Sequence, residues 1–373
     1  MRATVAVISD LTTDMRVQKH ALLLADMGYT VTLIGRKTRE SLRLSLPPVR
    51  IKRLRVPFRK GPMMYLSFNV ALLFRILTRR TNLFVANDLD TLIPCYLASR
   101  LFRKPLVYDA HEYFTGQYGL EERKRVYSIW KRAERWLLPK VRYMMTVSNS
   151  IADLYREEYG VNPLVIMNVA PSTETVFLHR RSELGAADDD LLVVYQGSGI
   201  NHGRGAMELV NAMSMLEKVR LIIAGSGDMI EELKQTVEDR GLNNNIIFLP
   251  RMRWDKMMGF TMCCDVGLSL DPDNCINQRF SLPNKLFDYI AAGIPSVVSP
   301  LPEVSSIINK YACGLVLSDV TPYAIAGILE RLRDDGALRS ELKENAIAAS
   351  RELNWENERV KEQEFFRSII KHK

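Results

Sequence analysis

The sequence is poor in the residues and runs that would identify several classes of protein. It has five cysteines in 373 residues, and none stands in a paired spacing typical of a zinc site. The adjacent Cys263 and Cys264 are poorly placed to bond each other, so we expect buried, reduced thiols and a cytoplasmic location. The opening residues, MRATVAVISD, hold too short an apolar run for a signal peptide. No cluster of His, Asp and Glu suggests a metal, so neither a metal nor a cofactor is expected.

Glycine is missing at the place where a dinucleotide-binding protein needs it. SDLTTDMRV, which follows the first expected strand, contains no glycine. The glycine-rich stretches 197–205 and 224–228 lack the G-x-G-x-x-G spacing of a first strand–helix turn. They are either tight connections or places where the backbone can approach a phosphate, as at Gly199 with Arg204 close in sequence. NAD binding is therefore not predicted.

Positive charge is concentrated in one half of the chain. Residues 1–170 hold 28 Lys and Arg against 14 Asp and Glu, whereas the remainder holds 23 against 29. Such asymmetry indicates an anionic partner for the first half. No nucleic-acid recognition motif and no basic surface interleaved with aromatic residues accompanies the charge, so nucleic acid is not predicted. A membrane surface or an anionic lipid-linked substrate fits the charge.

Short β-rich runs alternate with amphipathic helical patterns along both halves. The first half is expected to begin with a strand at 4–9, a helix at 17–28 and a strand at 30–35, and the second half begins again with a strand at 191–197. Near-continuous hydrophobic strands separated by helices are typical of a parallel sheet covered on both faces. The sequence therefore predicts an α/β protein of two doubly wound Rossmann-like domains.

The domain boundaries follow from the place where the apolar periodicity stops. No apolar period persists at 171–190, which we interpret as a linker. The first domain is then 1–170 and the second is 191–352. Residues 353–373 show the pattern of a terminal amphipathic helix, which we expect to pack back on the first domain.

The stretch 281–299, SLPNKLFDYIAAGIPSVVS, predicts a helix with charged residues near its start. Ser281 is expected to cap the helix and Gly293 to end it. The unpaired N–H groups of a helix start attract phosphate, and Lys285 adds a full charge there. Asp288 lies one turn further on the same side and can accept hydrogen bonds from a vicinal diol. This combination suits a nucleoside diphosphate, although from spacing alone a solvated Lys–Asp pair explains the pattern as well.

The same stretch, extended to SLPNKLFDYIAAGIPSVVSPLPEV, resembles the donor-binding segment of the retaining GT-B glycosyltransferases of family four (glycosyl transferase group 1). Further stretches resemble this family in the same order along nearly the whole chain, at 14–35, 105–114 (PLVYDAHEYF), 195–213 (YQGSGINHGRGAMELVNAM), 221–252 and 263–270. The resemblance implies the GT-B fold, in which two domains face each other across a cleft. It also implies transfer of a sugar from a nucleotide-sugar donor to a glycan or lipid-linked acceptor, with retention of anomeric configuration, in cell-surface polysaccharide or lipopolysaccharide assembly.

The resemblance further implies roles for individual residues. His111 would be the catalytic residue that faces the transferred sugar from the first domain, and Asp288 would bind the donor ribose. The remaining implied positions are Arg204, Lys285, Asn284 and Gly199 for the donor diphosphate, Pro250, Arg251, Met252 and Arg253 for the nucleobase, and Asp14, Arg16 and Asp88 on the acceptor side.

Departures from the family pattern bear on these roles. The family's paired acidic motif has Phe280 at its first position here, and Asp288 in place of glutamate at its second. Thr12 and Thr13 replace the usual glycine pair after the first strand. A sugar-nucleotide epimerase of the same architecture and a non-catalytic GT-B-like subunit therefore stay open as alternatives.

A second acidic pair needs a separate interpretation. Asp271 and Asp273 form an Asp-x-Asp in LDPDN, the metal-binding signature of the unrelated GT-A glycosyltransferases. The two-domain pattern contradicts that fold, so we interpret LDPDN as a proline-containing turn.

The segment 49–80 alternates basic clusters with apolar residues. It is too short and polar to span a membrane. It is either a core helix of the first domain or a surface that touches an anionic bilayer. Together with the charge of the first half, this segment leads us to expect peripheral binding to the cytoplasmic face of a membrane, where a lipid-diphosphate acceptor is delivered.

Overall fold

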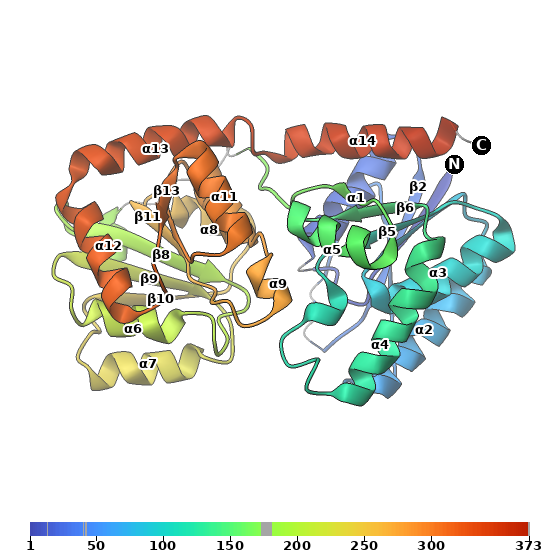
Figure 1. Cartoon of the computed structure of the whole chain (residues 1–373), viewed down its shortest axis with the longest axis horizontal. Coiled ribbons are helices and arrows are strands. Elements are labelled where there is room, and N and C mark those ends of the chain that lie inside the picture. The colour runs from blue at the N-terminus through green and yellow to red at the C-terminus, as the bar shows by residue number, and fades with distance from the viewer. Residues whose placement is uncertain (13, 40, 42, 173–180, 372–373) are drawn as a thin grey trace. The chain divides into compact units, whose positions relative to one another are not determined.

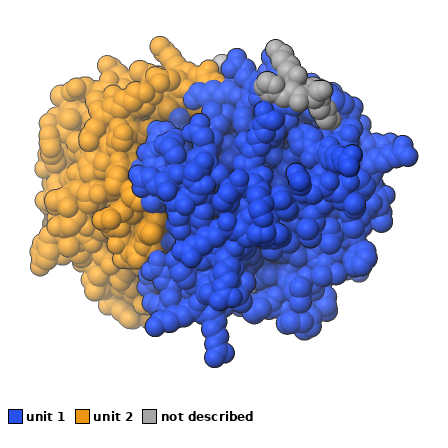
Figure 2. Space-filling model, turned by 45° about the vertical axis from the view of Figure 1, so that its right-hand side comes forward, with its two compact units in different colours: residues 1–167, 359–373 blue, residues 168–358 orange. Residues whose placement is uncertain are grey.

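The computed structural model describes residues 1–12, 14–39, 41, 43–172 and 181–371. Thr13 and residues 173–180 of the predicted linker lie outside the described residues. The chain divides into two compact units, which are coloured separately in Figure 2. Unit 1 consists of residues 1–167 and 359–373, and unit 2 consists of residues 168–358.

Unit 1 is built on a seven-stranded parallel sheet in the order β3-β2-β1-β4-β5-β6-β7 (Figure 1). Its strands are β1 (Arg2–Ala6), β2 (Thr30–Arg36), β3 (Arg50–Leu54), β4 (Leu83–Asn87), β5 (Leu106–Ala110), β6 (Tyr143–Thr146) and β7 (Leu164–Val165). Its helices are α1 (Met15–Asp26), α2 (Pro62–Leu77), α3 (Leu89–Phe102), α4 (Lys124–Leu137) and α5 (Asn149–Tyr159), with short η1 (Phe114–Gly116) and η2 (Leu138–Lys140). Every residue of β4 and β5 is buried, as in parallel sheets covered on both faces.

Unit 2 repeats this plan with a six-stranded parallel sheet in the order β10-β9-β8-β11-β12-β13. Its strands are β8 (Leu191–Gly197), β9 (Val219–Gly225), β10 (Ile246–Pro250), β11 (Val266–Ser269), β12 (Ser296–Val298) and β13 (Gly314–Val316). Its helical segments are η3 (Arg181–Leu184), α6 (Ala206–Met213), α7 (Ile230–Asp239), α8 (Trp254–Thr261), α9 (Ile276–Arg279), α10 (Asn284–Ala291), α11 (Pro302–Tyr311), α12 (Pro322–Asp334) and α13 (Gly336–Ser350). The expectation of two doubly wound domains is confirmed.

In each sheet the strand order reverses once, between β1 and β4 in unit 1 and between β8 and β11 in unit 2. Ligands of open α/β sheets bind outside the carboxyl ends of the strands at such a reversal, because the loops on either side diverge there. In unit 1 this place receives Asp88, which follows β4. In unit 2 it receives Arg204, in the loop after β8, and Asp271, in the loop after β11. The topology thus brings together residues that are far apart in sequence.

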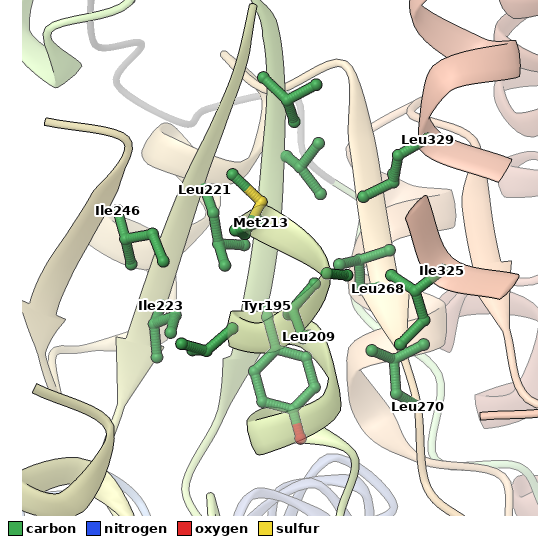
Figure 3. Packing of buried hydrophobic residues seen from close by; sticks show 14 of the residues in the cluster. Tyr195, Leu209, Met213, Leu221, Ile223, Ile246, Leu268, Leu270, Ile325 and Leu329 are labelled. Atoms are coloured by element: carbon green, nitrogen blue, oxygen red, sulfur yellow. The ribbon is translucent and has the colours of Figure 1, made fainter. Parts of the chain in front are cut away.

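One hydrophobic cluster forms the main core of unit 2 (Figure 3). Leu221 of β9 and Leu268 of β11 pack with Leu209 of α6 and Leu329 of α12, and none of these side chains is exposed. Tyr195 of β8 belongs to the same cluster and is 1% exposed. Because its ring is fixed by this core, Tyr195 provides a rigid support for the polar side chains at the end of β8.

The last helix, α14 (Trp355–Lys371), belongs to unit 1 from Arg359 onward. Phe366 is fully buried and Ile369 is 3% exposed. At the rim, Arg359 Nη2 lies 2.6 Å from Asp26 Oδ2 of α1. The expectation that the C-terminal helix packs back on the first domain is confirmed.

Residues 49–80 do not form one helix. Arg50–Leu54 form β3, which pairs in parallel with β2, and α2 begins only at Pro62. The physical reason lies in Pro57 and Gly61, which interrupt the helical pattern between β3 and α2.

The start of α10 also differs from its prediction, whereas its end agrees. Ser281 does not cap the helix, because its hydroxyl donates to the Gln278 carbonyl oxygen at 3.0 Å. Pro283 occupies the capping position without a side-chain hydrogen bond. Gly293 has a φ of +68°, the left-handed conformation expected just after a helix end.

All five cysteines are free thiols. Cys95, Cys264 and Cys313 are buried as expected, but Cys263 and Cys275 are half-exposed. In the part of the chain that the structure describes, no helix combines the length and the apolar composition needed to cross a bilayer.

Candidate functional site

Two cations of unit 2 converge on one buried carboxylate. Arg204 Nη1 lies 2.9 Å from Asp271 Oδ1, and Lys285 Nζ lies 3.2 Å from Asp271 Oδ2. The side chain of Asp271 is 4% exposed, that of Lys285 is 12% exposed and that of Arg204 is 42% exposed. Asp271 therefore holds the two predicted diphosphate-binding cations next to each other, with Arg204 nearer to solvent.

The members of this cluster keep one another ionised. Burial acts to lower the pKa of Lys285, but the charge of Asp271, the neighbouring Tyr195 and the hydrogen bond to Asp271 together outweigh burial, and the pKa is raised. Burial acts to raise the pKa of Asp271, but Lys285 and Arg204 outweigh it and the pKa is lowered. The ring of Tyr195 lies 4.7 Å from Lys285 Nζ, and its hydroxyl donates to the Arg204 carbonyl oxygen at 2.7 Å. The cluster carries two positive charges and one negative charge, so it has a net positive charge that a bound anion can neutralise.

Asp288 lies one turn after Lys285 and is held by two side chains. Trp254 Nε1 donates to Asp288 Oδ1 at 2.8 Å, and Gln196 Nε2 donates to Asp288 Oδ2 at 3.0 Å. The orientation of the Gln196 amide is fixed because its Oε1 accepts the Thr261 hydroxyl at 2.7 Å. These contacts fix the orientation of the Asp288 carboxylate, whose oxygens can each accept more than one hydrogen bond.

Glycine is sterically required at two positions near this cluster but not at a third. Gly205 has a φ of +78°, and a Cβ there would lie 2.4 Å from the Leu270 carbonyl oxygen. Gly225 has a φ of +141°, and a Cβ there would lie 1.8 Å from a backbone oxygen of β8. The backbone therefore leaves no room for a side chain at these two positions, which are tight connections in the chain. A Cβ on Gly199 would meet no heavy atom nearer than 3.8 Å, so Gly199 leaves space where a ligand could approach the backbone.

The other predicted donor-side residues lie on the surface of unit 2. Asn284 is the first residue of α10; it is exposed, and its Oδ1 accepts the Asn168 amide at 2.9 Å. The predicted nucleobase loop, Pro250–Arg253, is exposed except for a half-buried third residue, Met252. The next residue, Trp254, opens α8 and binds the predicted ribose residue, so the structure places this loop beside Asp288.

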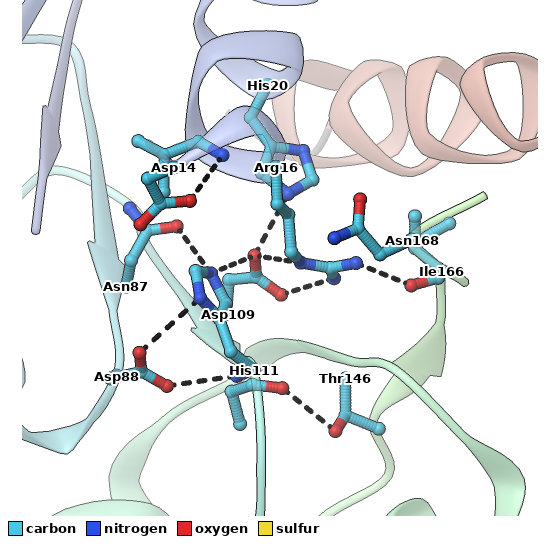
Figure 4. A network of polar contacts seen from close by, with 12 residues as sticks. Asp14, Arg16, His20, Asn87, Asp88, Asp109, His111, Thr146, Ile166 and Asn168 are labelled. Atoms are coloured by element: carbon cyan, nitrogen blue, oxygen red, sulfur yellow. Dashed lines mark hydrogen bonds and ion pairs between the residues drawn. The ribbon is translucent and has the colours of Figure 1, made fainter. Parts of the chain in front are cut away.

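The polar cluster of unit 1 is centred on Asp109, a fully buried carboxylate of β5 (Figure 4). Arg16 of α1 donates to it twice, from Nη2 to Oδ1 at 2.7 Å and from Nε to Oδ2 at 2.9 Å. Asp109 Oδ2 also lies 2.9 Å from His20 Nε2 and 3.2 Å from His111 Nε2. Arg16 and His20 are buried, whereas His111 is 19% exposed. His111 is therefore the member of this set that reaches the surface.

The surroundings of His111 favour its protonated form. Its Nδ1 lies 3.4 Å from Asp88 Oδ2, and its backbone N–H donates to Asp88 Oδ1 at 3.0 Å. Burial acts to lower the pKa of His111, but Asp88 and Asp109 outweigh burial and raise the pKa to about 10. As an imidazolium, His111 can donate hydrogen bonds and face negative charge, but it cannot accept a proton as a general base.

Asp88 is held in a strained backbone conformation next to His111. Its φ of 59° and ψ of 163° are rare for residues other than glycine and cost about 1–3 kcal/mol. The conformation is maintained because the Asp88 N–H donates to the Asp109 carbonyl oxygen at 2.9 Å while its side chain binds His111. The strain thus serves to direct the Asp88 carboxylate at the imidazolium.

The other two predicted acceptor-side residues have different surroundings. Asp14 caps α1, since its Oδ1 accepts the Val17 N–H at 3.2 Å, and it is half-buried. Arg16 is 4% exposed, and its Nη1 donates to the Ile166 carbonyl oxygen at 2.7 Å. Arg16 therefore positions Asp109 and does not present its charge to solvent.

A second histidine links this cluster to α14. His20 Nδ1 lies 2.5 Å from Glu362 Oε1, and both side chains are fully buried. Burial acts to lower the pKa of His20, but Glu362 and Asp109 outweigh burial and raise it. The C-terminal helix thus supplies a carboxylate to the network that ends at His111.

The substitution Glu362→Ala is expected to reduce the free energy of unfolding by about 3–5 kcal/mol, because it removes one of the two carboxylates that contact the buried His20 side chain. Urea denaturation of wild type and variant measures the change. Glu364→Ala, at an exposed position of the same helix, is the control and is expected to change stability by less than about 0.5 kcal/mol. Equal losses in the two variants would contradict a stabilising role for the His20–Glu362 contact.

Sequence reasoning missed the residues that hold the predicted ones in place. The interpretation of Asp271 as part of a turn is wrong as a description of its role, because its carboxylate is buried between two cations. Asp271 and Asp109 stand at or just after strand ends, and that signal could have identified them. No local pattern marks the others, whose partners are distant in sequence. The residues missed are Asp109, Asp271, Gln196, Trp254, His20 and Glu362.

Comparison with known proteins gives the family. Residues 16–169 match the model described as Glycosyltransferase Family 4, and residues 179–349 match the model described as Glycosyl transferases group 1. The uncharacterized glycosyltransferase MJ1607 of Methanocaldococcus jannaschii is 27% identical over 202 residues, 53% of this chain and 50% of that protein. The lipopolysaccharide core biosynthesis glycosyltransferase LpsD of Rhizobium meliloti is 27% identical over 164 residues, 43% of this chain and 45% of that protein. The chain spans about half the length of the curated relatives it matches.

Solved structures share the fold at low identity. Sucrose-phosphate synthase from Thermosynechococcus elongatus has a TM-score of 0.84 at 15% identity, covering 100% of both chains. Anabaena HepE, solved with UDP-glucose, has a TM-score of 0.75 at 16% identity, covering 99% of this chain and 100% of that one. The fold is that of the GT-B glycosyltransferases. Since the two family models together account for most of the sequence, the chain belongs to family four of this class, as the resemblance indicated.

Proposed function

We propose that this protein transfers a sugar from a nucleotide-sugar donor. The observation that carries the proposal is the pairing of Arg204 and Lys285 on Asp271, one helical turn from the rigidly held Asp288. A nucleoside diphosphate presents adjacent negative charges followed by a ribose diol, and unit 2 offers cations followed by a carboxylate in the same order. HepE, which has this fold and was solved with UDP and with UDP-glucose, supports a nucleotide sugar as the donor.

In this proposal the negatively charged donor diphosphate neutralises part of the positive charge of Arg204 and Lys285, which is otherwise paired with Asp271. Arg204 is exposed enough to turn toward a phosphate, whereas Lys285 is fixed by burial and by Tyr195. Lys285 and the N–H groups at the start of α10 then stabilise the diphosphate as it leaves. Asn284 and Gly199 line the same site, and Pro250–Arg253 meet the nucleobase. The cations supply the positive charge that the leaving group needs, so neither a metal nor a cofactor is part of the proposal.

His111 is proposed to act on the transferred sugar. Because it is an imidazolium, it donates a hydrogen bond to the sugar and does not take the acceptor proton. The leaving diphosphate takes the proton of the acceptor hydroxyl, which attacks from the face that the diphosphate leaves. This course retains the anomeric configuration.

The acceptor is proposed to be a glycan or a lipid-diphosphate-linked glycan in cell-surface polysaccharide or lipopolysaccharide assembly. The name of the LpsD relative supports the process, and the basic excess of residues 1–170 supports an anionic acceptor. Asp14 and Asp88 are the proposed acceptor-side residues. The proposed location is the cytoplasmic face of a membrane.

A thermal-shift panel of UDP, GDP, ADP, CMP and dTDP tests the donor site. One nucleotide is expected to raise the Tm of the wild type, because a ligand that binds only the folded state stabilises it. Asp288→Ala is expected to lose most of this shift, since it removes the ribose contact. Asp273→Ala is the control, because this exposed carboxylate pairs with Arg279 and lies outside the proposed site. A shift that is unchanged in Asp288→Ala would contradict the assigned role.

The same preparation separates the alternatives. Release of the nucleotide that depends on an acceptor is expected of a glycosyltransferase. Conversion of the sugar nucleotide without any acceptor would instead identify an epimerase. Absence of any shift with the nucleotides and with intact sugar nucleotides would favour a non-catalytic subunit.

A further inference from the structure

Helix α2 carries apolar side chains on two opposite sides. The buried side consists of Met64, Phe68, Leu72 and Ile76, which are at most 7% exposed. The outer side consists of Met63, Leu66, Val70 and Phe74, which are 50%, 57%, 45% and 69% exposed. These four residues recur at intervals of three and four, so they form one continuous stripe. A helix that is apolar on both sides is normally buried on both, and the part of the chain that the structure describes leaves this stripe uncovered.

Helix α3 packs against both α2 and α4 (Figure 1), and α3 and α4 also carry exposed apolar side chains. The rings of Tyr65 on α2 and Trp130 on α4 are 5.3 Å apart, and those of Tyr96 on α3 and Trp136 on α4 are 6.0 Å apart. Further exposed apolar side chains are Leu97 and Leu101 on α3, at 42% and 67%, and Ile129 and Trp136 on α4, at 61% and 48%. We call the outer surface of α2, α3 and α4 the three-helix face.

The exposed charge of the three-helix face is positive. The acidic residues within these three helices are Asp90 and Glu134, which are 6% and 0% exposed. The nearest exposed acidic residues in sequence are Glu121 and Glu122, just before α4. The exposed basic residues on the helices and next to their ends are Arg59, Lys60, Arg80, Arg100, Arg103, Arg123, Lys124, Arg125, Arg132, Arg135 and Lys140. The exposed charged residues on these helices and next to their ends are therefore mostly basic.

Helix α4 is anchored from its inner side, so its outer side is a preformed surface. Lys131 Nζ lies 2.7 Å from Glu158 Oε2 and 2.9 Å from the Tyr113 hydroxyl oxygen. On the outer side, Lys140 Nζ lies 4.6 Å from the ring of Trp136, which places a cation against an exposed aromatic ring. An aromatic ring with an adjacent cation suits the boundary between lipid headgroups and acyl chains.

We propose that the three-helix face docks on an anionic lipid bilayer. Its apolar side chains enter the headgroup boundary while its Lys and Arg side chains lie against anionic headgroups. A second copy of the chain fits less well, because each face would meet its own positive charge. A nucleic acid would neutralise the charge but leave the aliphatic stripe of α2 without an apolar partner. The inference deepens the proposed function, on which its link to a lipid-linked acceptor rests.

Flotation with lipid vesicles tests the proposal without donor or acceptor. The wild type is expected to bind vesicles of phosphatidylcholine with about 30% phosphatidylglycerol and not vesicles of phosphatidylcholine alone. The double substitution Leu66→Glu and Phe74→Glu is expected to lower the partition coefficient at least about tenfold, because it places charge in the apolar boundary. Raising the salt from about 50 mM to about 500 mM is expected to weaken wild-type binding, since headgroup attraction is screened.

Val360→Glu is the matched control, because Val360 is 53% exposed on α14 of the same unit. It is expected to bind vesicles as the wild type does, and all variants are checked for an unchanged Tm. Equal binding to neutral and anionic vesicles, or wild-type binding by the double variant, overturns the proposal. A dimer that dissociates in the double variant, without vesicle binding by the wild type, also overturns it and assigns the face to a second copy. The donor thermal-shift panel is independent of these results, so failure here and failure of the proposed chemistry are distinguishable.

Discussion

Lys285→Met is expected to lower kcat/KM for sugar transfer by about 10²–10³-fold, because it removes a fixed positive charge from the departing diphosphate. Methionine keeps the unbranched apolar part of the side chain but lacks the Nζ that lies over the Tyr195 ring, so the loss reports the ammonium group. The variant also leaves Asp271 with Arg204 as its cation, and a lower Tm is expected. Steady-state kinetics with the nucleotide sugar identified by the thermal-shift panel measure the effect.

The position of the charge gives this prediction a second readout. Lys285→Met is expected to weaken binding of a nucleoside diphosphate more than binding of the corresponding monophosphate. Lys310→Met is the control, since Lys310 is 62% exposed and pairs with Glu352 away from the site. Equal losses for diphosphate and monophosphate would show that Lys285 acts on the fold of the site and not on the phosphates.

His111→Gln is expected to lower kcat by about 10²-fold while donor binding is largely kept, because the imidazolium acts on the sugar during transfer. Glutamine retains a hydrogen-bond donor but not the charge. Kinetics and donor titration on the same preparation separate the two quantities, and Glu364→Gln provides the exposed control. Turnover at the wild-type rate would remove His111 from the mechanism.

The pH dependence follows from the same imidazolium. The pKa of His111 is about 10, raised from the ordinary value near 6.5. The protonated form is therefore complete below about 6.5 in both folded and unfolded chains, and between these two values folding takes up a proton. The stabilising contribution of His111 is fully present at the acidic end and is lost as pH rises through about 10. Transfer is expected to fall over the same range in the wild type and not in His111→Gln. Activity that rises with pH there would indicate a general base instead.

Both units use the same construction at their candidate sites. In unit 1, Asp109 holds Arg16, His20 and His111, and in unit 2, Asp271 holds Arg204 and Lys285. In each case a buried carboxylate at a strand end balances several cations, one of which is partly exposed. Such an arrangement fixes a positive group at the surface without leaving a buried charge unpaired.

Much of the fold could be predicted from the sequence because it depends on local periodicity. The strand at 191–197 matches β8, and the strand at 30–35 matches β2 within a residue. The failures are equally local in origin. The edge strand β3 is rich in basic residues, so its apolar content did not mark it as a strand. The Ser281 hydroxyl donates to a carbonyl oxygen of the preceding turn, and this hydrogen bond competes with capping of α10.

By itself, the sequence determined the two parallel α/β domains, the family, and the candidate positions that a local motif marks, such as Lys285, Asp288 and His111. Their roles remain predictions. Only the tertiary structure decided which residues hold them, since Asp271, Trp254 and Asp88 reach their partners from other elements. It also decided that the apolar residues of α2 divide between a buried side and an exposed one. Periodicity reports which residues share a face of their own helix, whereas partners and burial depend on which elements the sheet order brings side by side.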